Sequence, residues 1–404
     1  MSPPSSPNAA TGSAREVFAA FLRLGLSSFG GPIAHLGYFR REFVERRRWL
    51  DDRSYAQLLA VCQFLPGPAS SQMGYAIGLM RAGWRGALAA FVGFTLPSAL
   101  LLFAFAALSP HLEPLVATTL VHGLKLVAVA VVAQGVLAMA RQLAPDLPRL
   151  LLAGLTAALV LWSGSTSMQL GAIALGALLG PWLCRRLIPT PAPAFPLRYG
   201  ARGGALAFAV FALGLAATWL APSGAPTLSA LAAGFYRTGA LVFGGGHVVL
   251  PLLERVTVDT GWIGSEAFLA GYGAAQAVPG PMFSLAALLG AQVPTGAPAA
   301  LAATVALLAI FLPGFLLLSA TLPVWSRVAG SARAARALAG VNAAVVGLLA
   351  AALYDPVWTS GIGSWRDVAI AAVAFALLAW LRRPPLWAVS WCVLAAAASA
   401  WLGG

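Results

Sequence analysis

Four glycine- and proline-rich breaks interrupt apolar segments, and their residue types suit the binding of an anion. The residues that form them are Gly30, Gly31, Pro32, Gly67, Pro68, Gly244, Gly245, Gly246, Gly280 and Pro281. A break frees the backbone N–H groups at the start of the following half-helix, where proline is well tolerated. Such an end carries roughly half a positive charge. Four ends that meet near the membrane midplane would therefore form an anion site.

Polar and basic side chains near these breaks are candidates for the same site. Lys125 lies inside the apolar run 116–140, where a lysine costs about 2.5–3.5 kcal/mol and needs a cavity or a partner. We expect it to anchor a dianion, and the alternative is a paired or snorkelling lysine. Asn342 occupies the matching place in the second half. The other candidate donors are Arg23, Arg237, Gln63, Gln276, Ser28, Ser70 and Ser71.

Three titratable side chains are candidates for coupling transport to protons. His35 and His247 follow the two Phe-Gly-Gly motifs, and a histidine titrates near neutral pH. Glu254 follows the second motif, and carboxylates inside membranes often serve as proton relays. The alternative is a structural role, with hydrogen-bonded histidines and an ion pair between Glu254 and Arg255.

The composition places these residues in an all-α polytopic membrane protein. The 404-residue chain is 60% hydrophobic and only 9% charged, against about 25% charged residues in soluble domains. Apolar runs of about 20 residues, such as 87–108 and 116–140, are typical of membrane-spanning helices. These runs do not alternate between apolar and polar residues, which excludes a membrane β-barrel.

Charge and cysteine content exclude several other classes. The net charge of +13 comes mostly from arginines in short connections, where they set membrane topology, so we expect no nucleic-acid partner. Three widely separated cysteines suggest neither a disulfide framework nor a metal site. No nucleotide-binding loop and no catalytic set are present, so we expect no cofactor and no enzymatic activity. Residues 1–13 are polar and predicted to form a disordered cytoplasmic tail.

An internal repeat organises the chain. The segment Phe21–Gly31 matches Phe235–Gly245, and Gln63–Pro68 matches Gln276–Pro281 after the loss of a single residue between the two motifs. We therefore divide the chain into a first repeat (14–184), a Pro/Arg-rich cytoplasmic linker (185–202) and a connecting span with the second repeat (203–404).

The positions of the basic residues predict that the two repeats face opposite ways. Arginine clusters at 40–48, 81–85, 141–149 and 185–202 are assigned to the cytoplasm, together with the N-terminus. One additional span, 205–220, then starts the second repeat on the outer side. The resulting inverted repeat has roughly 9 full spans plus 4 re-entrant hairpins at the breaks, about 13 hydrophobic segments in all.

Several stretches resemble the chromate ion transporter family, of the long-chain type with two homologous domains. They are "FLRLGLSSFGGPIAHLGYFRREFVERRRWL" and "QFLPGPASSQMGYAIGLMRAGWRGA" in the first half, and "FGGGHVVLPLLERV" and "QAVPGP" in the second. The second half departs from the first in lacking a polar pair like Ser71-Gln72. The resemblance implies secondary active chromate efflux across the bacterial inner membrane, driven by the membrane potential or the proton gradient. Some members of the family are linked instead to other oxyanions such as sulfate.

The sequence leaves several alternatives open. A passive anion channel could use the same helix ends without ion coupling. A membrane enzyme acting on lipid or prenyl substrates would need metal ligands or a nucleophile–base set, and neither is present. The expected partners are an inorganic oxyanion and the lipid bilayer. The choice between chromate and sulfate, the direction of transport, the coupling ion, a homodimeric assembly and the geometry of the hairpins stay open.

Overall fold

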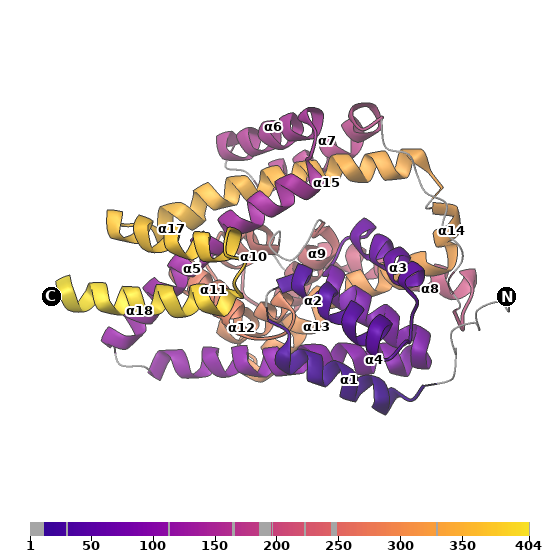
Figure 1. Ribbon diagram of the computed structural model, residues 1–404, viewed down its shortest axis with the longest axis horizontal. Coiled ribbons are helices and arrows are strands. Elements are labelled where there is room, and N and C mark those ends of the chain that lie inside the picture. The colour runs from indigo at the N-terminus through magenta and orange to yellow at the C-terminus, as the bar shows by residue number, and fades with distance from the viewer. Residues whose placement is uncertain are drawn as a thin grey trace.

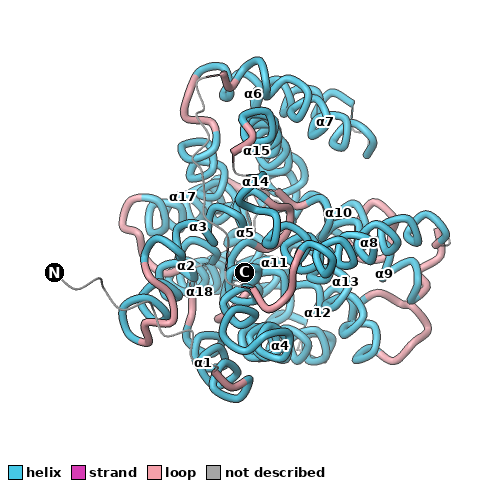
Figure 2. The backbone as a smooth tube through the Cα atoms, turned by 90° about the vertical axis from the view of Figure 1, so that its right-hand side faces the viewer, coloured by secondary structure: helices cyan, strands magenta, loops and turns pink. Residues whose placement is uncertain are grey.

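The computed structural model describes most of the chain, and the described part consists of helices and loops without a strand (Figures 1 and 2). The described residues are 12–29, 31–111, 114–163, 166–185, 195, 197–221, 224–243, 249–328 and 330–403. Within these described residues, five helices are long and apolar enough to cross a membrane: Ala69–Leu108, Thr118–Leu143, Ala201–Leu220, Ala299–Val324 and Ala332–Gly361. The prediction of a polytopic helical membrane protein is confirmed, while the number of spans stays a prediction.

The first half begins with short helices and continues with long ones. Its elements are α1 (Ala14–Ser27), α2 (Gly31–Arg40), the π-helix η1 (Arg41–Arg46), α3 (Asp52–Phe64), α4 (Ala69–Leu108), η2 (Ser109–His111), α5 (Pro114–Leu143), α6 (Leu147–Ser163) and α7 (Thr166–Leu183). The connecting helix α8 (Ala201–Ala217) follows and runs into η3 (Thr218–Leu220).

The second half repeats this order with a few more short segments. Its elements are α9 (Leu228–Leu241), α10 (Val249–Thr257), α11 (Ser265–Ala277), η5 (Met282–Ser284), α12 (Leu285–Gln292), α13 (Ala299–Thr321), η6 (Leu322–Val324), α14 (Trp325–Val328), α15 (Ala332–Ala352), η7 (Leu353–Trp358), α16 (Thr359–Gly361), α17 (Trp365–Ala379) and α18 (Pro385–Gly403). The two described ends of the chain lie at opposite ends of the long axis (Figure 1).

The ends of the short helices follow from local sequence. The Ser13 hydroxyl accepts a hydrogen bond from the Glu16 N–H and caps α1, and the Asp51 carboxylate does the same for α3 through Ser54. Ser13 thus belongs to a helix cap, while residues 1–11 of the predicted tail lie outside the described residues. The helices α3 and α11 end where Leu65 and Val278 adopt extended backbone, because each of these residues precedes a proline.

The helix α4 is folded back on itself. Its backbone leaves the helical region at Ala82 and Gly83, and Gly83 has a φ of +63°. A Cβ atom on Gly78 would collide with the carbonyl of Gly86, although residues eight apart in a straight helix are about 12 Å apart. The arms 69–81 and 84–108 therefore pack against each other. The first arm follows α3 across the break at Pro66-Gly67-Pro68, and the re-entrant hairpin there stays a prediction.

The element boundaries repeat in the same register as the sequence. The alignment that pairs Phe21 with Phe235 also pairs both ends of α1 with both ends of α9. The alignment that pairs Gln63 with Gln276 pairs both ends of α3 with both ends of α11, and it pairs the turn at Gly83 with Gly296, which has a φ of +76°. The helix α8 lies between the two sets. The repeat is thus visible in the secondary structure, and the inversion of its second copy stays a prediction.

Tight packing holds the first set of short helices together. The helix α1 lies against α4, and Phe21 of α1 stacks on Phe43 with ring centroids 4.8 Å apart. Phe39 meets Phe94 edge to face at 5.1 Å. The helices α6 and α7 lie beside α15 at one side of the molecule (Figure 2). Large apolar side chains are exposed on α6 and α8, among them Leu151, Trp162, Leu206 and Leu213, as expected of surfaces that face lipid.

Candidate functional site

Two equivalent hydrogen bonds join the breaks of the two halves. The N–H of Gly280 donates to the carbonyl oxygen of Ser28 at 2.9 Å, and the N–H of Gly67 donates to that of Val242 at 2.6 Å. In the alignment of the repeats, Val242 is the counterpart of Ser28, and Gly280 is the counterpart of Gly67. Each Pro-Gly-Pro turn is therefore hydrogen-bonded to the residue that immediately precedes the Phe-Gly-Gly motif of the other half. Gly67 has a φ of +124° and Gly280 a φ of +101°, a backbone region that residues with a side chain rarely adopt.

His35 joins the two breaks of the first half. Its imidazole is fully buried, with Nε2 at 3.2 Å from the carbonyl oxygen of Ser28 and Nδ1 at 3.5 Å from the hydroxyl of Ser70. A carbonyl oxygen only accepts, so Nε2 carries the proton and Nδ1 accepts from Ser70. The ring also meets Phe94 edge to face at 5.2 Å. The predicted proton-coupling residue thus touches both ends of the first-half site.

Gln72 closes the first Pro-Gly-Pro turn. Its buried side-chain amide donates to the carbonyl oxygen of Pro66 at 2.9 Å and to that of Gly314, on α13, at 3.0 Å. The sequence analysis expected the amide of Gln63 to donate to the anion, but Gln63 is exposed. Gln276 is buried, and its amide nitrogen lies 3.4 Å from the sulfur of Met282. The sequence feature that could have identified Gln72 is the polar pair Ser71-Gln72, which has no counterpart in the second half.

Two buried hydroxyls lie close to these breaks without a partner among the described residues. They belong to Ser28, which is 1% exposed, and Ser71, which is 4% exposed. Ser71 is in the first turn of α4, whose N-cap position is occupied by Pro68 and has no side-chain capping hydrogen bond. The first N–H groups of α4 and the two hydroxyls are hydrogen-bond donors that can bind an external acceptor. An oxyanion supplies such acceptors without needing an ionised side chain.

Lys125 has a protein partner in the other half. Its ammonium lies 3.1 Å from the carboxylate of Glu266, at the start of α11. The lysine side chain is largely buried, whereas that of Glu266 is 76% exposed. The helices α5 and α11 pack so closely that a Cβ on Gly273 would collide with the carbonyl of Leu124. The paired alternative for this lysine is therefore present in the structure. The sequence did not point to Glu266 as a partner of Lys125, because the residue that matches Glu266 in the first half is Arg53.

The remaining predicted residues are placed as follows. Arg23 and Arg237 are both exposed at equivalent places on α1 and α9. Asn342 is buried on α15, and its side-chain oxygen Oδ1 has no hydrogen-bond partner among the described residues. Glu254 is partly buried on α10. The residues outside the described part are Gly30, Gly244, Gly245, Gly246 and His247; Gly31 begins α2, and the side chain of Pro32 is likewise not described.

The site therefore contains backbone donors, hydroxyls and one neutral histidine. Among the described residues, no group of three His, Cys, Asp or Glu side chains is arranged to hold a metal ion. The three cysteines Cys62, Cys184 and Cys392 are free and buried. Such an arrangement can hold and release a small anion by hydrogen bonding.

Comparison with known proteins gives a consistent result. The family model described as "Chromate transporter" matches residues 15–181 and 229–400. The chain is 30% identical over 409 residues to the chromate transport protein of Pseudomonas aeruginosa, covering 96% of this chain and 92% of the relative.

More distant relatives carry similar names. The chromate transport protein of Cupriavidus metallidurans is 28% identical over 341 residues, with 84% of this chain and 81% of the relative covered. An uncharacterized transporter of Methanocaldococcus jannaschii is 26% identical over 346 residues, with coverages of 84% and 83%. No solved structure matches the chain. With both halves matched by the family model and the relatives aligned over most of their length, this chain belongs to the chromate transporter family.

Proposed function

We propose that the protein is a secondary active transporter that exports chromate across the bacterial cytoplasmic membrane, driven by the proton-motive force. The observation that carries the anion site is a pair of buried hydroxyls without a partner among the described residues, that of Ser71 in the uncapped first turn of α4 and that of Ser28 at the end of α1. The halves exchange hydrogen bonds at the same place. A dianion bound here lies between the two repeats, where transporters of this architecture hold their substrates.

Hydrogen-bond donors without a formal charge suit a substrate that must also leave. Each donor interacts more strongly in a buried, low-dielectric site than it would in water. A hydrogen bond to a charged group is worth about 1.5–3 kcal/mol. Several such bonds hold chromate, and no buried counter-ion has to be neutralised when it dissociates.

The two hydrogen bonds between the halves form a contact that can switch between two arrangements. In an inverted repeat, the contact of Gly280 with Ser28 and the contact of Gly67 with Val242 are equivalent by symmetry and lie on opposite sides of the substrate. If one of these hydrogen bonds lengthens while the other is kept, the site opens toward one side of the membrane. We propose this as the basis of alternating access.

His35 connects protonation to the same site. Its Nδ1 accepts from the Ser70 hydroxyl in the neutral form. A proton on Nδ1 turns this nitrogen into a donor, so the Ser70 hydroxyl must rotate and accept instead. Proton uptake by His35 thereby changes the donors that face the anion. His247 and Glu254 stay secondary candidates for the coupling.

The test uses inside-out membrane vesicles that contain the protein and are exposed to labelled chromate. With an imposed proton-motive force, we expect chromate to accumulate against its gradient and to be lost on addition of an uncoupler. Uptake that only equilibrates identifies a channel. We also expect sulfate to compete, because both are tetrahedral dianions and backbone donors distinguish them poorly. Absence of chromate and sulfate flux would refute the substrate assignment.

A further inference from the structure

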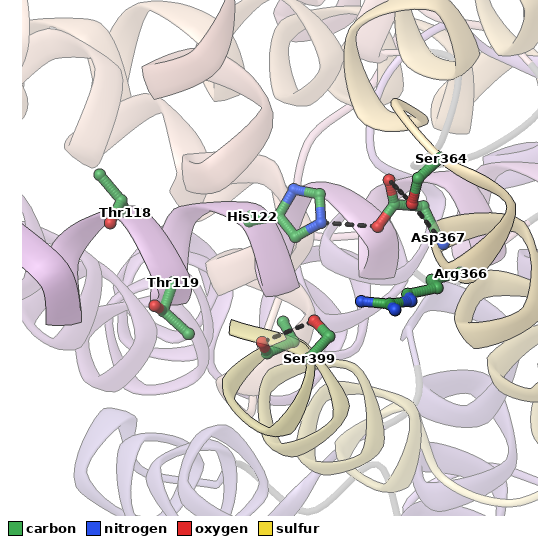
Figure 3. A pocket seen from close by; sticks show the side chains of 8 residues that line it. Thr118, Thr119, His122, Ser364, Arg366, Asp367 and Ser399 are labelled. Atoms are coloured by element: carbon green, nitrogen blue, oxygen red, sulfur yellow. Dashed lines mark hydrogen bonds and ion pairs between the residues drawn. The ribbon is translucent and has the colours of Figure 1, made fainter. Parts of the chain in front are cut away.

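A second polar cavity lies away from the breaks, between α5, α17 and α18. It has a volume of about 340 Å³ and is lined by Thr118, Thr119 and His122 of α5, Arg366 and Asp367 of α17, and Ser399 of α18 (Figure 3). By the predicted topology it opens at the outer end of α5. The cavity combines side chains of both repeats, and neither the family match nor the proposed site at the breaks assigns it a role.

The one carboxylate of the cavity is already engaged. Asp367 is 5% exposed and accepts hydrogen bonds from His122 Nε2 at 2.7 Å, from the Gly363 N–H at 3.0 Å and from the Ser364 hydroxyl at 3.0 Å. Three donors of the protein therefore satisfy its carboxylate oxygens. The carboxylate orients His122 and leaves the opposite ring edge, Nδ1, free of this contact.

Arg366 gives the cavity its positive charge. Figure 3 shows its guanidinium reaching into the cavity, below His122 and above Ser399. The side chain is exposed, and within the described part of the chain the structure records no ion pair for it. It is also in the first turn of the 15-residue helix α17, where the helix dipole favours an anion.

We propose that this cavity is a separate binding site for a small tetrahedral oxyanion, held by the guanidinium of Arg366. The inference rests on the proposed function, since it describes where the transported anion pauses at the outer end of its path. A guanidinium fork matches two oxygens of such an anion, and the cavity is large enough for the hydrated ion.

The experiment uses a cysteine reporter in the full-length protein, in proteoliposomes of neutral phosphatidylcholine. The native cysteines are buried, so Thr119→Cys is the reactive position, and Ser399→Cys is a second reporter if the first variant misfolds. The rate of modification by an anionic methanethiosulfonate, divided by the rate for a cationic one, reports the local potential. We expect Arg366→Gln to lower this ratio by about tenfold. Arg366→Lys should keep most of the ratio, and Arg382→Gln, at the other end of α17, should leave it unchanged.

Protection by the ion itself decides the assignment. Sulfate or chromate should slow modification of the reporter, and this protection should disappear in Arg366→Gln. Protection that appears only when phosphatidylglycerol is added would assign the site to a lipid phosphate and overturn the proposal. Equal protection in Arg366→Gln and the parent would also overturn it.

Chromate uptake, measured in the same proteoliposomes, separates this proposal from the proposed function. Uptake without protection removes the cavity site and leaves the transporter assignment intact. Protection without uptake supports the cavity site and removes the transport assignment. Loss of both removes both.

Discussion

At the residue scale, one backbone carbonyl oxygen of the candidate site accepts hydrogen bonds from both halves of the chain. The carbonyl oxygen of Ser28 accepts from Gly280 of the second half and from His35 of the first. The hydroxyl of the same residue is buried without a partner among the described residues. Ser28 therefore fixes the two halves with its main chain and offers a donor to substrate with its side chain.

Replacing that hydroxyl gives the sharpest test of the anion site. Ser28→Ala keeps both backbone hydrogen bonds and removes one donor, so we expect chromate to bind about tenfold more weakly, as for a hydrogen bond to a charged group. Ser27→Ala is the matched control, because Ser27 is exposed and its hydroxyl donates only to the carbonyl of Arg23. Equal affinity of the two variants, measured by equilibrium binding of labelled chromate in detergent, would remove Ser28 from the site.

The ion pair of Lys125 with Glu266 calls for a double-mutant cycle. If Lys125 serves the anion, Lys125→Ala abolishes uptake, while Glu266→Gln leaves the lysine charge available and strengthens chromate binding several-fold. If the pair only holds α5 against α11, both single variants lose stability to a similar extent and the double variant loses little more. Chromate affinity and thermal stability, measured on all four proteins, distinguish the two roles.

Acid should weaken the arginine-rich connection between α2 and α3. Burial by itself raises the pKa of Glu42, but hydrogen bonds from Arg47 at 2.6 Å and Arg46 at 3.0 Å lower it overall. A lowered folded-state pKa contributes stability above the ordinary value of 4.5 that is lost as the pH falls through the folded value. The difference in melting temperature between wild type and Glu42→Gln should therefore shrink below pH 4.5. A difference that stays constant down to pH 3 would contradict this assignment.

At the element scale, the Pro-Gly-Pro turns are the parts that hold the breaks together. A Cβ on Gly67 would lie 2.8 Å from the amide nitrogen of Gln72 and 3.0 Å from Cα of Gly314, and Gly280 is similarly crowded by Ser98. The hydroxyl of Ser98 is in turn hydrogen-bonded to that of Ser284 at 2.6 Å. Each turn therefore contacts the other half through backbone and side chain together.

Substitution of Gly67 should disturb both the turn and the contact between halves. We expect Gly67→Ala to cost about 1–3 kcal/mol from backbone strain alone, and more because Gln72 and α13 must move. The control is Gly224→Ala, which has a φ of +97° and no neighbouring atom within 4 Å. The melting temperature and the chromate uptake should both fall further for Gly67→Ala than for Gly224→Ala. Equal losses would mean that the close packing contributes nothing.

The breaks and the helix boundaries were predictable, because they depend on local chemistry. Proline excludes the preceding residue from the helix, and the register of the sequence repeat recurs in the boundaries of α1, α3, α9 and α11. The partners of the site were not predictable, since they are brought together by tertiary packing. Glu266 lies 141 residues from Lys125, and Asp367 lies 245 residues from His122. Neither carboxylate stands out in the sequence or matches an acidic residue in the first repeat.

At the scale of the whole molecule, the predicted inversion concerns the direction of the second repeat in the membrane. Asp52 begins α3, and its counterpart Ser265 begins α11. In an inverted repeat these equivalent positions lie on opposite sides of the membrane. The segment Ala201–Leu220, which contains α8, is long and apolar enough to cross a membrane and would supply the additional crossing that the inversion requires.

Labelling of these two positions tests the inversion. In cells treated with an impermeant thiol reagent, we expect Ser265→Cys to react and Asp52→Cys to react only after the membrane is opened. Arg198→Cys in the predicted cytoplasmic linker and Gly224→Cys after α8 are the internal and external controls. The native cysteines are buried and give a low background. Reaction of Asp52→Cys and Ser265→Cys from the same side would show a parallel repeat instead.

The crossed hydrogen bonds of Gly67 and Gly280 also bear on how such a protein could be assembled from smaller chains. A chain with a single repeat has one glycine donor and one carbonyl acceptor, and each needs its counterpart on a second molecule. Two separate chains would have to meet in the membrane in opposite orientations, and their pairing would depend on how much of each is made. Fusion through α8 replaces that encounter by an effective concentration of roughly millimolar or above. The fused chain thus fixes the stoichiometry of its two halves at synthesis.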